Sequence, residues 1–203
     1  IQGGFRPLKN IMGLWLIQEC RRDWQKAGQS YSWNEIVEEA KKAEPFRSII
    51  DPDYGEFFAG GRMIEKIQSF CRETKQPVPE TVGQIARCIY ESLALKYRWA
   101  LERLEEIKGE HITQLNIVGG GCNNKLLDQF AADATDRTVV TGPVEGAAIG
   151  NLLAQAMALG DIKSMDALRD VVRRSEPVET YRPNHTPAWE HAYQRMLSYM
   201  ERK

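Results

Sequence analysis

Apolar residues recur every three or four positions through most of the first half of the chain, which is the spacing of helices that bury one face. Breakers divide this half into segments: Gly28, a loop-like stretch over 45–61, and the two prolines of the QPVP run. Ser32 followed three residues later by Glu35 has the pattern of a capping box at a helix start. The pattern predicts helices over residues 8–27, 33–43, 63–73 and 80–108.

The pattern changes after Gly109, which closes the longest predicted helix. Short apolar runs then alternate with helical segments, as in proteins that pack helices against a parallel sheet. We expect strands over 114–118 and 137–141, a short extended piece near 177–181, and helices over 123–134, 146–159, 164–174 and 187–202. The predicted fold class is α/β, helix-rich, with a small parallel sheet.

Two or three short strands do not make a self-sufficient sheet, and parallel strands are normally covered on both faces. The chain also opens at Ile1, without an initiator methionine, inside what reads as a running segment. We therefore expect a piece of a longer protein, in which upstream strands complete the sheet.

Composition narrows the class of protein. The 203 residues include 27 basic and 28 acidic side chains without a long basic run, which argues against nucleic acid as the main partner. The longest apolar run, around residues 11–17, is too short to span a bilayer. Four scattered cysteines and three histidines do not predict a zinc site. We expect a soluble, cytoplasmic protein.

The strongest candidate for chemistry is the Gly119-Gly120-Gly121 turn between a predicted strand and a predicted helix. A ligand can approach backbone that carries no Cβ, and a helix start adds unpaired N–H donors and the positive end of a dipole. This combination favours a nucleotide or another flat or anionic ligand. The alternative is a tight strand-to-helix turn, although three consecutive glycines exceed what a turn needs. The run fits neither a G-x-G-x-x-G motif nor a Walker A loop.

Two neighbouring features are open to more than one interpretation. Asn123 and Asn124 stand where a helix begins, so N-capping is at least as consistent as ligand contact. Gly142-Pro143, with Glu145 close behind, forms a second turn after a strand. Two such turns at one sheet edge are the usual ligand crevice of α/β sheets.

Four stretches together resemble the C-terminal, nucleotide-binding portion of the FGGY carbohydrate kinases. They are FRPLKNIMGLWLIQECRRDW, QPVPETVGQIARCIYESLALKYR, LNIVGGGCNNKLLDQFAADAT and TVVTGPVEGAAIGN, in the family's order and across essentially the whole chain. Within the family they are most similar to the members that act on L-rhamnulose. The resemblance implies an actin-like, ribonuclease-H-like domain that holds ATP against an N-terminal sugar domain. The implied reaction is phosphorylation of L-rhamnulose at its 1-hydroxyl by ATP, with Mg²⁺ bound through the phosphates.

The resemblance also implies roles for individual residues. Gly120 corresponds to an ATP contact, with Gly119 and Gly121 as its neighbours, and Asn124 to a position on the adenine side.

In the LKNIMGLWLIQ motif, Asn10 corresponds to a sugar contact and Gln18 to an ATP contact. Eight residues are about two helical turns, so we expect both on nearly one face of the predicted helix over 8–27. Cys71 and Cys88 flank the QPVP run, and the resemblance implies a pair that can be disulfide-linked, against a default of free thiols in the cytoplasm.

The chain departs from the family in one respect that bears on mechanism. The family's general base is an aspartate near the start of the C-terminal domain, and no such segment occurs here. We therefore assign no catalytic residue and no metal ligand, and expect the chain alone to be inactive. We expect one nucleotide-binding domain over 1–203, with a helical insertion over about 29–110 and a β/α part over about 111–203. The alternatives are a kinase for another sugar, such as L-fuculose, and a non-catalytic helical interaction module.

Overall fold

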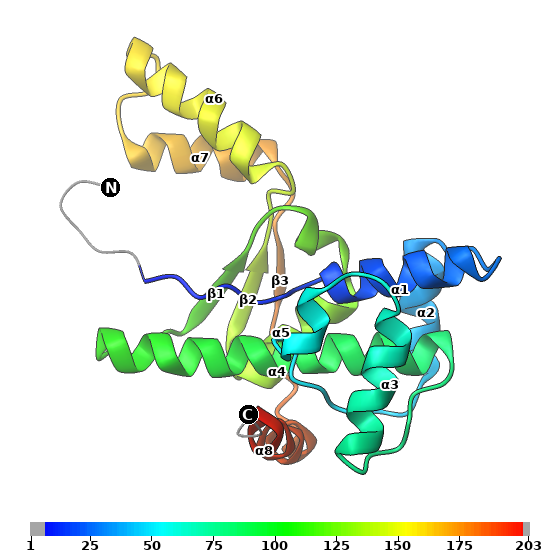
Figure 1. The fold of residues 1–203 in the computed structure, drawn as a ribbon. Helices are drawn as coiled ribbons and strands as arrows, with labels where there is room; N and C mark the ends of the chain where they lie inside the picture. The colour runs from blue at the N-terminus through cyan, green and yellow to red at the C-terminus, as the bar shows by residue number, and fades with distance from the viewer. Residues whose placement is uncertain (1–6, 201–203) are drawn as a thin grey trace.

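The computed structural model describes residues 7–200, and Figure 1 shows how their helices and strands are arranged. The first part of the chain holds α1 (Trp15–Lys26), α2 (Trp33–Lys42), the 3₁₀ turn Gly55–Phe58, α3 (Met63–Glu73) and α4 (Val82–Lys108). The second part holds β1 (Gln114–Ile117), the 3₁₀ turn Gly120–Asn123, α5 (Lys125–Thr135), β2 (Thr138–Thr141), α6 (Gly146–Leu159), α7 (Met165–Ser175), β3 (Glu179–Tyr181) and α8 (Pro187–Met200). The expected helix-rich α/β class is confirmed.

Local sequence explains where several of these elements begin and end. The predicted capping box is present at α2, where Ser32 Oγ accepts the Glu35 N–H and the Glu35 carboxylate accepts the Ser32 N–H. A second capping box joins Thr81 and Gln84 at the start of α4. At the other end of α4, Gly109 adopts a left-handed conformation with φ of 71° and stops the helix.

The first helix is shorter than the sequence pattern predicts. We expected it over 8–27, whereas α1 begins at Trp15 and residues 7–12 are neither helix nor strand. Gly13 has φ of 64°, a left-handed conformation that interrupts the right-handed helical path, so the apolar spacing before it does not continue α1.

The sheet has the order β1-β2-β3. β1 and β2 are parallel, with Gln114 opposite Thr138, as the strand–helix–strand pattern predicted. The expected extended piece near 177–181 forms β3, which is antiparallel to β2, so the small sheet is mixed rather than purely parallel. The reason is visible in Figure 1: α6 leads away from the end of β2 and α7 returns to it, so β3 starts beside the end of β2 and runs back.

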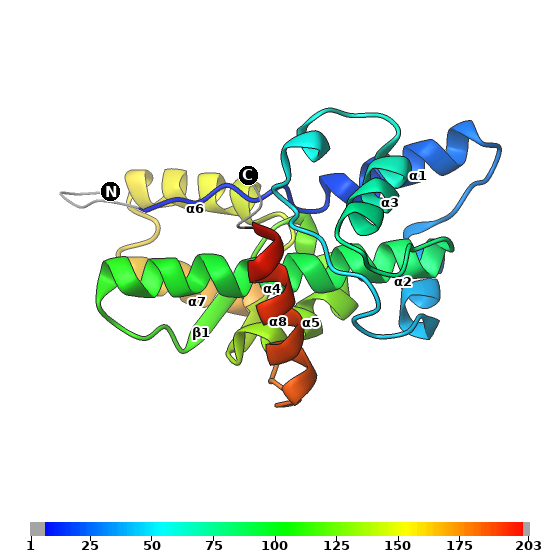
Figure 2. The same cartoon turned by 60° about the horizontal axis from the view of Figure 1, so that its bottom comes forward.

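Helix α4 lies at the centre of the main core. It packs against α2, α5 and α8, and α8 crosses it in Figure 2. The approach to α2 is very close at Gly83, where an added Cβ would lie 2.3 Å from the Glu39 carbonyl oxygen. A smaller cluster joins Val139 of β2 to the alanines of α5, so one face of the sheet is covered by helices.

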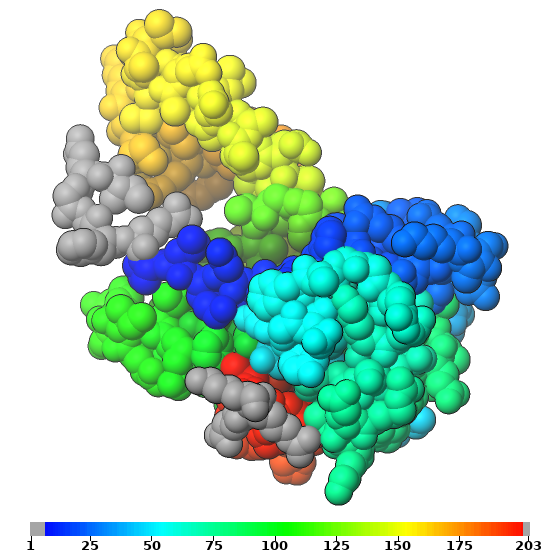
Figure 3. Space-filling view, viewed as in Figure 1, coloured from blue at the N-terminus to red at the C-terminus, as the bar shows by residue number. Residues whose placement is uncertain are grey.

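The α6–α7 pair projects from the rest of the molecule (Figures 1 and 3). Helix α6 has no charged residue, yet Leu153 is its one buried side chain among those the structure describes. Leu152 is 67% exposed and Leu159 is 80% exposed. Within residues 7–200, no helix combines the length and apolar character needed to cross a membrane.

Candidate functional site

The glycine turn after β1 and the turn after β2 lie side by side. The Gly119 N–H donates to the Pro143 carbonyl oxygen at 3.1 Å, and the Gly142 N–H donates to the Ile117 carbonyl oxygen at 2.9 Å. Because β1 and β2 are parallel, both turns lie at the same edge of the sheet. The structure therefore brings together the two turns that the sequence pattern placed at one edge.

The three glycines of the first turn differ in backbone conformation and in the space around them. Gly119 has φ of 85° and ψ of −165°, a conformation that is essentially restricted to glycine. A Cβ added to Gly121 would touch Ile117 Cγ2 at 3.6 Å, an ordinary contact, whereas one added to Gly120 would meet no protein atom within 4 Å. The backbone conformation thus requires glycine at 119, while the open face at 120 leaves room for a ligand.

That open face borders a cavity of about 690 Å³, a volume within the range of small-molecule sites. The cavity lies between the glycine turn, α1, α2 and α4. Its lining combines apolar or aromatic side chains with amides and glycine backbone: Leu14, Ile17, Gln18, Trp33, Asn34, Val37, Tyr90, Gly120, Gly121, Asn123 and Asn124. Apolar walls with a few polar groups are typical of sites for flat, partly polar ligands.

Five of the residues singled out in the sequence meet at this cavity: Gln18, Gly120, Gly121, Asn123 and Asn124. Gly119 is next to them in the turn but does not line it. Asn10 does not line it either.

Our expectation that Asn10 and Gln18 share a helix face is wrong, because α1 begins at Trp15 and Asn10 precedes it. Gln18 lies within α1, whereas Asn10 is exposed in the segment before the helix.

Asn124 serves the fold as well as the cavity. Its Oδ1 accepts the Leu127 N–H at 3.1 Å and so caps α5. Its side chain also hydrogen-bonds to the Tyr90 hydroxyl. Burial raises the pKa of Tyr90 well above its usual value, so this hydroxyl stays protonated. The N-cap interpretation is correct, and the same side chain lines the cavity.

Sequence reasoning missed the wall formed by Trp33, Val37 and Tyr90. The sequence pattern gave none of these three residues a role. Nothing in local spacing marks these residues, because they reach the cavity only through the packing of α2 and α4 against each other. Glu145 is exposed and does not line the cavity.

The cysteines take no part in this cavity. Cys71 and Cys88 are buried free thiols that hydrogen-bond to each other, and no disulfide joins them. The Cys122 thiol donates to the Ile117 carbonyl oxygen at 3.1 Å, which supports the turn.

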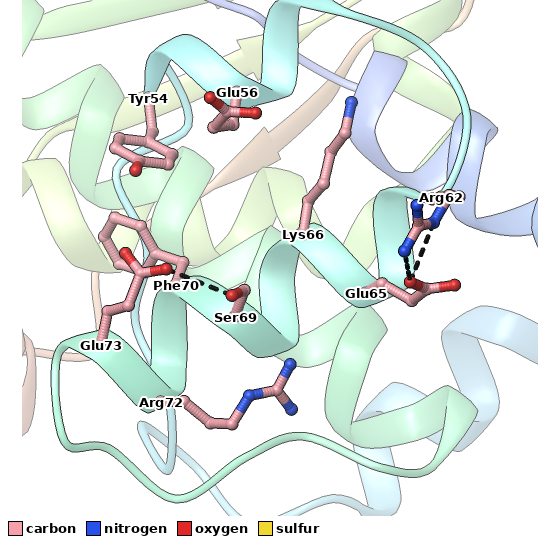
Figure 4. A pocket seen from close by; sticks show the side chains of 9 residues that line it. All are labelled: Tyr54, Glu56, Arg62, Glu65, Lys66, Ser69, Phe70, Arg72 and Glu73. Atoms are coloured by element: carbon pink, nitrogen blue, oxygen red, sulfur yellow. Dashed lines mark hydrogen bonds and ion pairs between the residues drawn. The ribbon is translucent and has the colours of Figure 1, made fainter.

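A second hollow, of about 470 Å³, lies on α3 and is shown in Figure 4. Three of its charged side chains already have protein partners: Arg62 pairs with Glu65, and Lys66 Nζ donates to the Ala59 carbonyl oxygen at 2.5 Å. Neither this hollow nor any other part of residues 7–200 gathers three His, Cys, Asp or Glu side chains that could hold a metal ion. The cavity at the glycine turn is the better candidate for a ligand.

Known proteins with similar sequences are sugar kinases. The sequence profile described as "FGGY family of carbohydrate kinases, C-terminal domain" matches residues 1–159. The chain is 45% identical to the rhamnulokinase of Bacteroides thetaiotaomicron, over 95% of this chain and 39% of that protein. It is 42% identical to the rhamnulokinase of Bacillus subtilis, over 88% of this chain and 36% of that protein. The chain thus spans less than two fifths of the length of these relatives.

Solved structures show the same fold. Plasmodium falciparum glycerol kinase with ADP aligns with a TM-score of 0.61 and 16% identity, over 94% of this chain and 37% of that one. Xylulose kinase from Rhodospirillum rubrum aligns with a TM-score of 0.58 and 18% identity, over 92% of this chain and 36% of that one. The profile match covers more than half of the sequence, and the relatives agree with it. The chain belongs to the FGGY family of carbohydrate kinases.

Proposed function

We propose that this chain is the ATP-binding C-terminal part of a cytoplasmic rhamnulokinase, which phosphorylates L-rhamnulose at its 1-hydroxyl during L-rhamnose breakdown. The observation that carries the proposal is the identity of 40–45% to rhamnulokinases from several bacteria, along nearly the whole chain. Within the proposal, residues 1–203 form one nucleotide-binding domain, with residues 29–110 as a helical insertion and residues 111–203 as its β/α part.

The cavity at the glycine turn fits ATP. Gly120 leaves open backbone where a Cβ would intrude on a ligand, and Trp33, Val37 and Tyr90 offer an apolar wall for a purine. Gln18 and Asn124 supply amides at the same cavity. When bound, ATP supplies the phosphoryl group; this chain's part is to hold the nucleotide in place.

Mg²⁺ belongs to the proposal through the phosphates of ATP. The described residues bring together no group of three carboxylate, thiol or imidazole side chains, so they do not fit a metal centre of their own. We assign no Mg²⁺ ligand and derive no metal-dependent step within this chain.

The remaining parts of the enzyme belong upstream. One face of the sheet packs on helices, while Gln114 and Asn116 of β1 are exposed on the other, and parallel strands are normally covered on both faces. Helix α6 is uncharged and largely exposed, although a helix that is apolar all round is normally buried. We propose that an upstream part covers these surfaces and supplies the sugar domain and the general base. Alone, the chain then transfers no phosphate.

The test is a coupled ADP-release assay on the full-length protein that carries this chain. L-Rhamnulose, L-fuculose and D-xylulose are compared at equal concentrations. The proposal predicts the highest kcat/KM on L-rhamnulose. A higher value on either of the other sugars contradicts it.

A further inference from the structure

The carboxylate of Asp53 accepts hydrogen bonds from the segment that precedes α1, whose Ile11 and Met12 side chains also pack against the main core. Asp53 Oδ1 accepts the Met12 backbone N–H at 3.0 Å. Asp53 Oδ2 accepts a hydrogen bond from Lys9 Nζ at 3.2 Å, and Lys9 Nζ also donates to the Asn10 carbonyl oxygen at 2.7 Å. Contacts on both sides of Asn10 therefore converge on one side chain that lies more than forty residues away in sequence.

The carboxylate of Asp53 is itself anchored to the core through α4. Lys96 Nζ lies 3.3 Å from Asp53 Oδ2 and 2.7 Å from Asp51 Oδ1, and the Lys96 side chain is only 3% exposed. The ammonium also lies 4.7 Å from the centre of the Trp99 ring. A buried ammonium group such as that of Lys96 is stable only when neighbouring groups compensate its charge. The positions of Asp51, Asp53 and Trp99 around Lys96 are therefore well defined.

The charge on Asp53 persists at neutral pH. Burial alone opposes ionisation, but the Met12 N–H and the ammonium groups of Lys96 and Lys9 outweigh it and lower the pKa of Asp53. The contacts that hold residues 9–12 are thus charge-assisted hydrogen bonds, which are stronger than neutral ones.

We propose that Asp53 is a positioning residue for the sugar: by fixing the backbone on both sides of Asn10, it sets where the Asn10 amide stands. This inference rests on the proposed function and on the sugar contact that the family resemblance implies for Asn10. Asn10 has no regular secondary structure around it, so its position depends on these hydrogen bonds together with the packing of Ile11 and Met12 against the core. Gln18, by contrast, is held by the hydrogen bonds of α1 and lines the nucleotide cavity. Loss of Asp53 therefore affects the sugar far more than the nucleotide.

Asp51 provides a matched control. It pairs with the same lysine, and its Oδ1 also accepts the Asp53 N–H at 3.1 Å. Among the described residues, no hydrogen bond or ion pair joins the Asp51 side chain to residues 9–12. Asp51→Asn and Asp53→Asn each remove one carboxylate beside Lys96, but only the second weakens the hold on Asn10.

The experiment uses the full-length protein with Asp53→Asn and Asp51→Asn, and measures kcat and both KM values. Asp53→Asn is expected to raise the KM for L-rhamnulose roughly tenfold, equivalent to about 1.4 kcal/mol. The KM for ATP should stay within about twofold, and Asp51→Asn should leave both within about twofold. An unchanged sugar KM in Asp53→Asn, an equal rise in both KM values, or the same sugar effect in Asp51→Asn would overturn the proposal.

Hydrogen exchange separates this inference from the proposed function. In the same variants, Asp53→Asn is expected to speed exchange at the Met12 amide, while Asp51→Asn leaves it unchanged. If the wild-type enzyme prefers another sugar, the proposed function fails, and the KM for that sugar decides the role of Asp53.

If Asp53→Asn does not fold, Lys9→Met replaces it. Lys9 is 42% exposed, and its loss removes one of the two hydrogen bonds that join Asp53 to the segment before α1. An unchanged sugar KM in Lys9→Met then overturns the proposal.

Discussion

Gly119 donates its backbone N–H to the carbonyl oxygen of Pro143 at 3.1 Å, and this hydrogen bond joins the turns that follow the two parallel strands. The bond places the open backbone of Gly120 beside a cavity bordered by three helices. A turn that is rigid at one glycine and open at the next is suited to hold a ligand against the backbone. The stability of the turn and its affinity for a ligand therefore depend on different glycines.

The two neighbouring glycines should respond differently to alanine. Gly119→Ala forces a side chain into a glycine-only conformation and is expected to lower the free energy of unfolding by about 1–3 kcal/mol. Gly120→Ala should change stability by less than about 0.5 kcal/mol, because its Cβ meets open space. That same Cβ should weaken ADP binding by roughly tenfold or more. Thermal unfolding and calorimetric titration of the full-length variants measure both effects, and unaltered ADP affinity in Gly120→Ala would argue against the site.

Asp128 should make stability depend on pH. Its side chain is 1% exposed and Oδ2 has no hydrogen-bond partner, so burial raises its pKa to about 7 from an ordinary 3.8. The folded state therefore retains the proton at a pH where the unfolded chain has lost it, and stability falls as pH rises from about 4 to about 7.

Asp128→Asn cannot ionise and should remove that fall. We expect it to be more stable than the wild type at pH 8 by roughly 1–3 kcal/mol. Asp166→Asn, at a side chain that is 89% exposed, is the control and should leave the pH profile unchanged. Urea unfolding between pH 4 and 8 measures the difference. If the free energy of unfolding changed with pH in the same way in Asp128→Asn and the wild type, burial of the Asp128 carboxylate would not be the cause of the fall in stability.

Two glycines within helices offer a test of packing. Gly83→Ala places a Cβ 2.3 Å from the Glu39 carbonyl oxygen, so α4 must move away from α2, and we expect a loss of about 1–3 kcal/mol. Gly150→Ala lies in α6 with no atom within 4 Å of the added Cβ, and should be neutral or stabilise by up to about 1 kcal/mol. Denaturant unfolding of the 203-residue chain compares them. Equal effects would mean that α4 does not approach α2 this closely.

The exposed face of α6 tests whether an upstream part covers it. Leu152→Asp should lower the free energy of unfolding of the full-length protein by more than about 2 kcal/mol, because the proposed upstream part would bury this leucine. In the 203-residue chain, where Leu152 is 67% exposed, the same change should cost less than about 0.5 kcal/mol. A small effect in both proteins would show that α6 stays exposed in the full-length enzyme.

Local sequence was sufficient for the parts of the fold that short-range interactions determine. Ser32 and Glu35 marked the start of α2, Gly109 marked the end of α4, and the glycine turn was located from its own residues. The start of α1 was not predictable from apolar spacing, because the left-handed Gly13 interrupts a pattern that otherwise continues.

Other features depend on packing between distant segments. The direction of β3 follows from the pairing of α6 with α7, which periodicity does not reveal. Trp33 and Tyr90 come to the cavity from helices that are far apart in sequence. Only the family motif singled out Gln18, which lines the cavity, and its expected shared helix face with Asn10 does not exist because α1 begins at Trp15.

The most direct test of the nucleotide site is a titration of the isotopically labelled 203-residue chain with ADP, followed by amide and indole NMR shifts. We predict saturable shifts at Gly120, Gly121, Gln18 and the Trp33 indole, with the α3 hollow of Figure 4 unaffected. Shifts confined to the α3 hollow, or a folded spectrum that ADP leaves unchanged, would contradict the account.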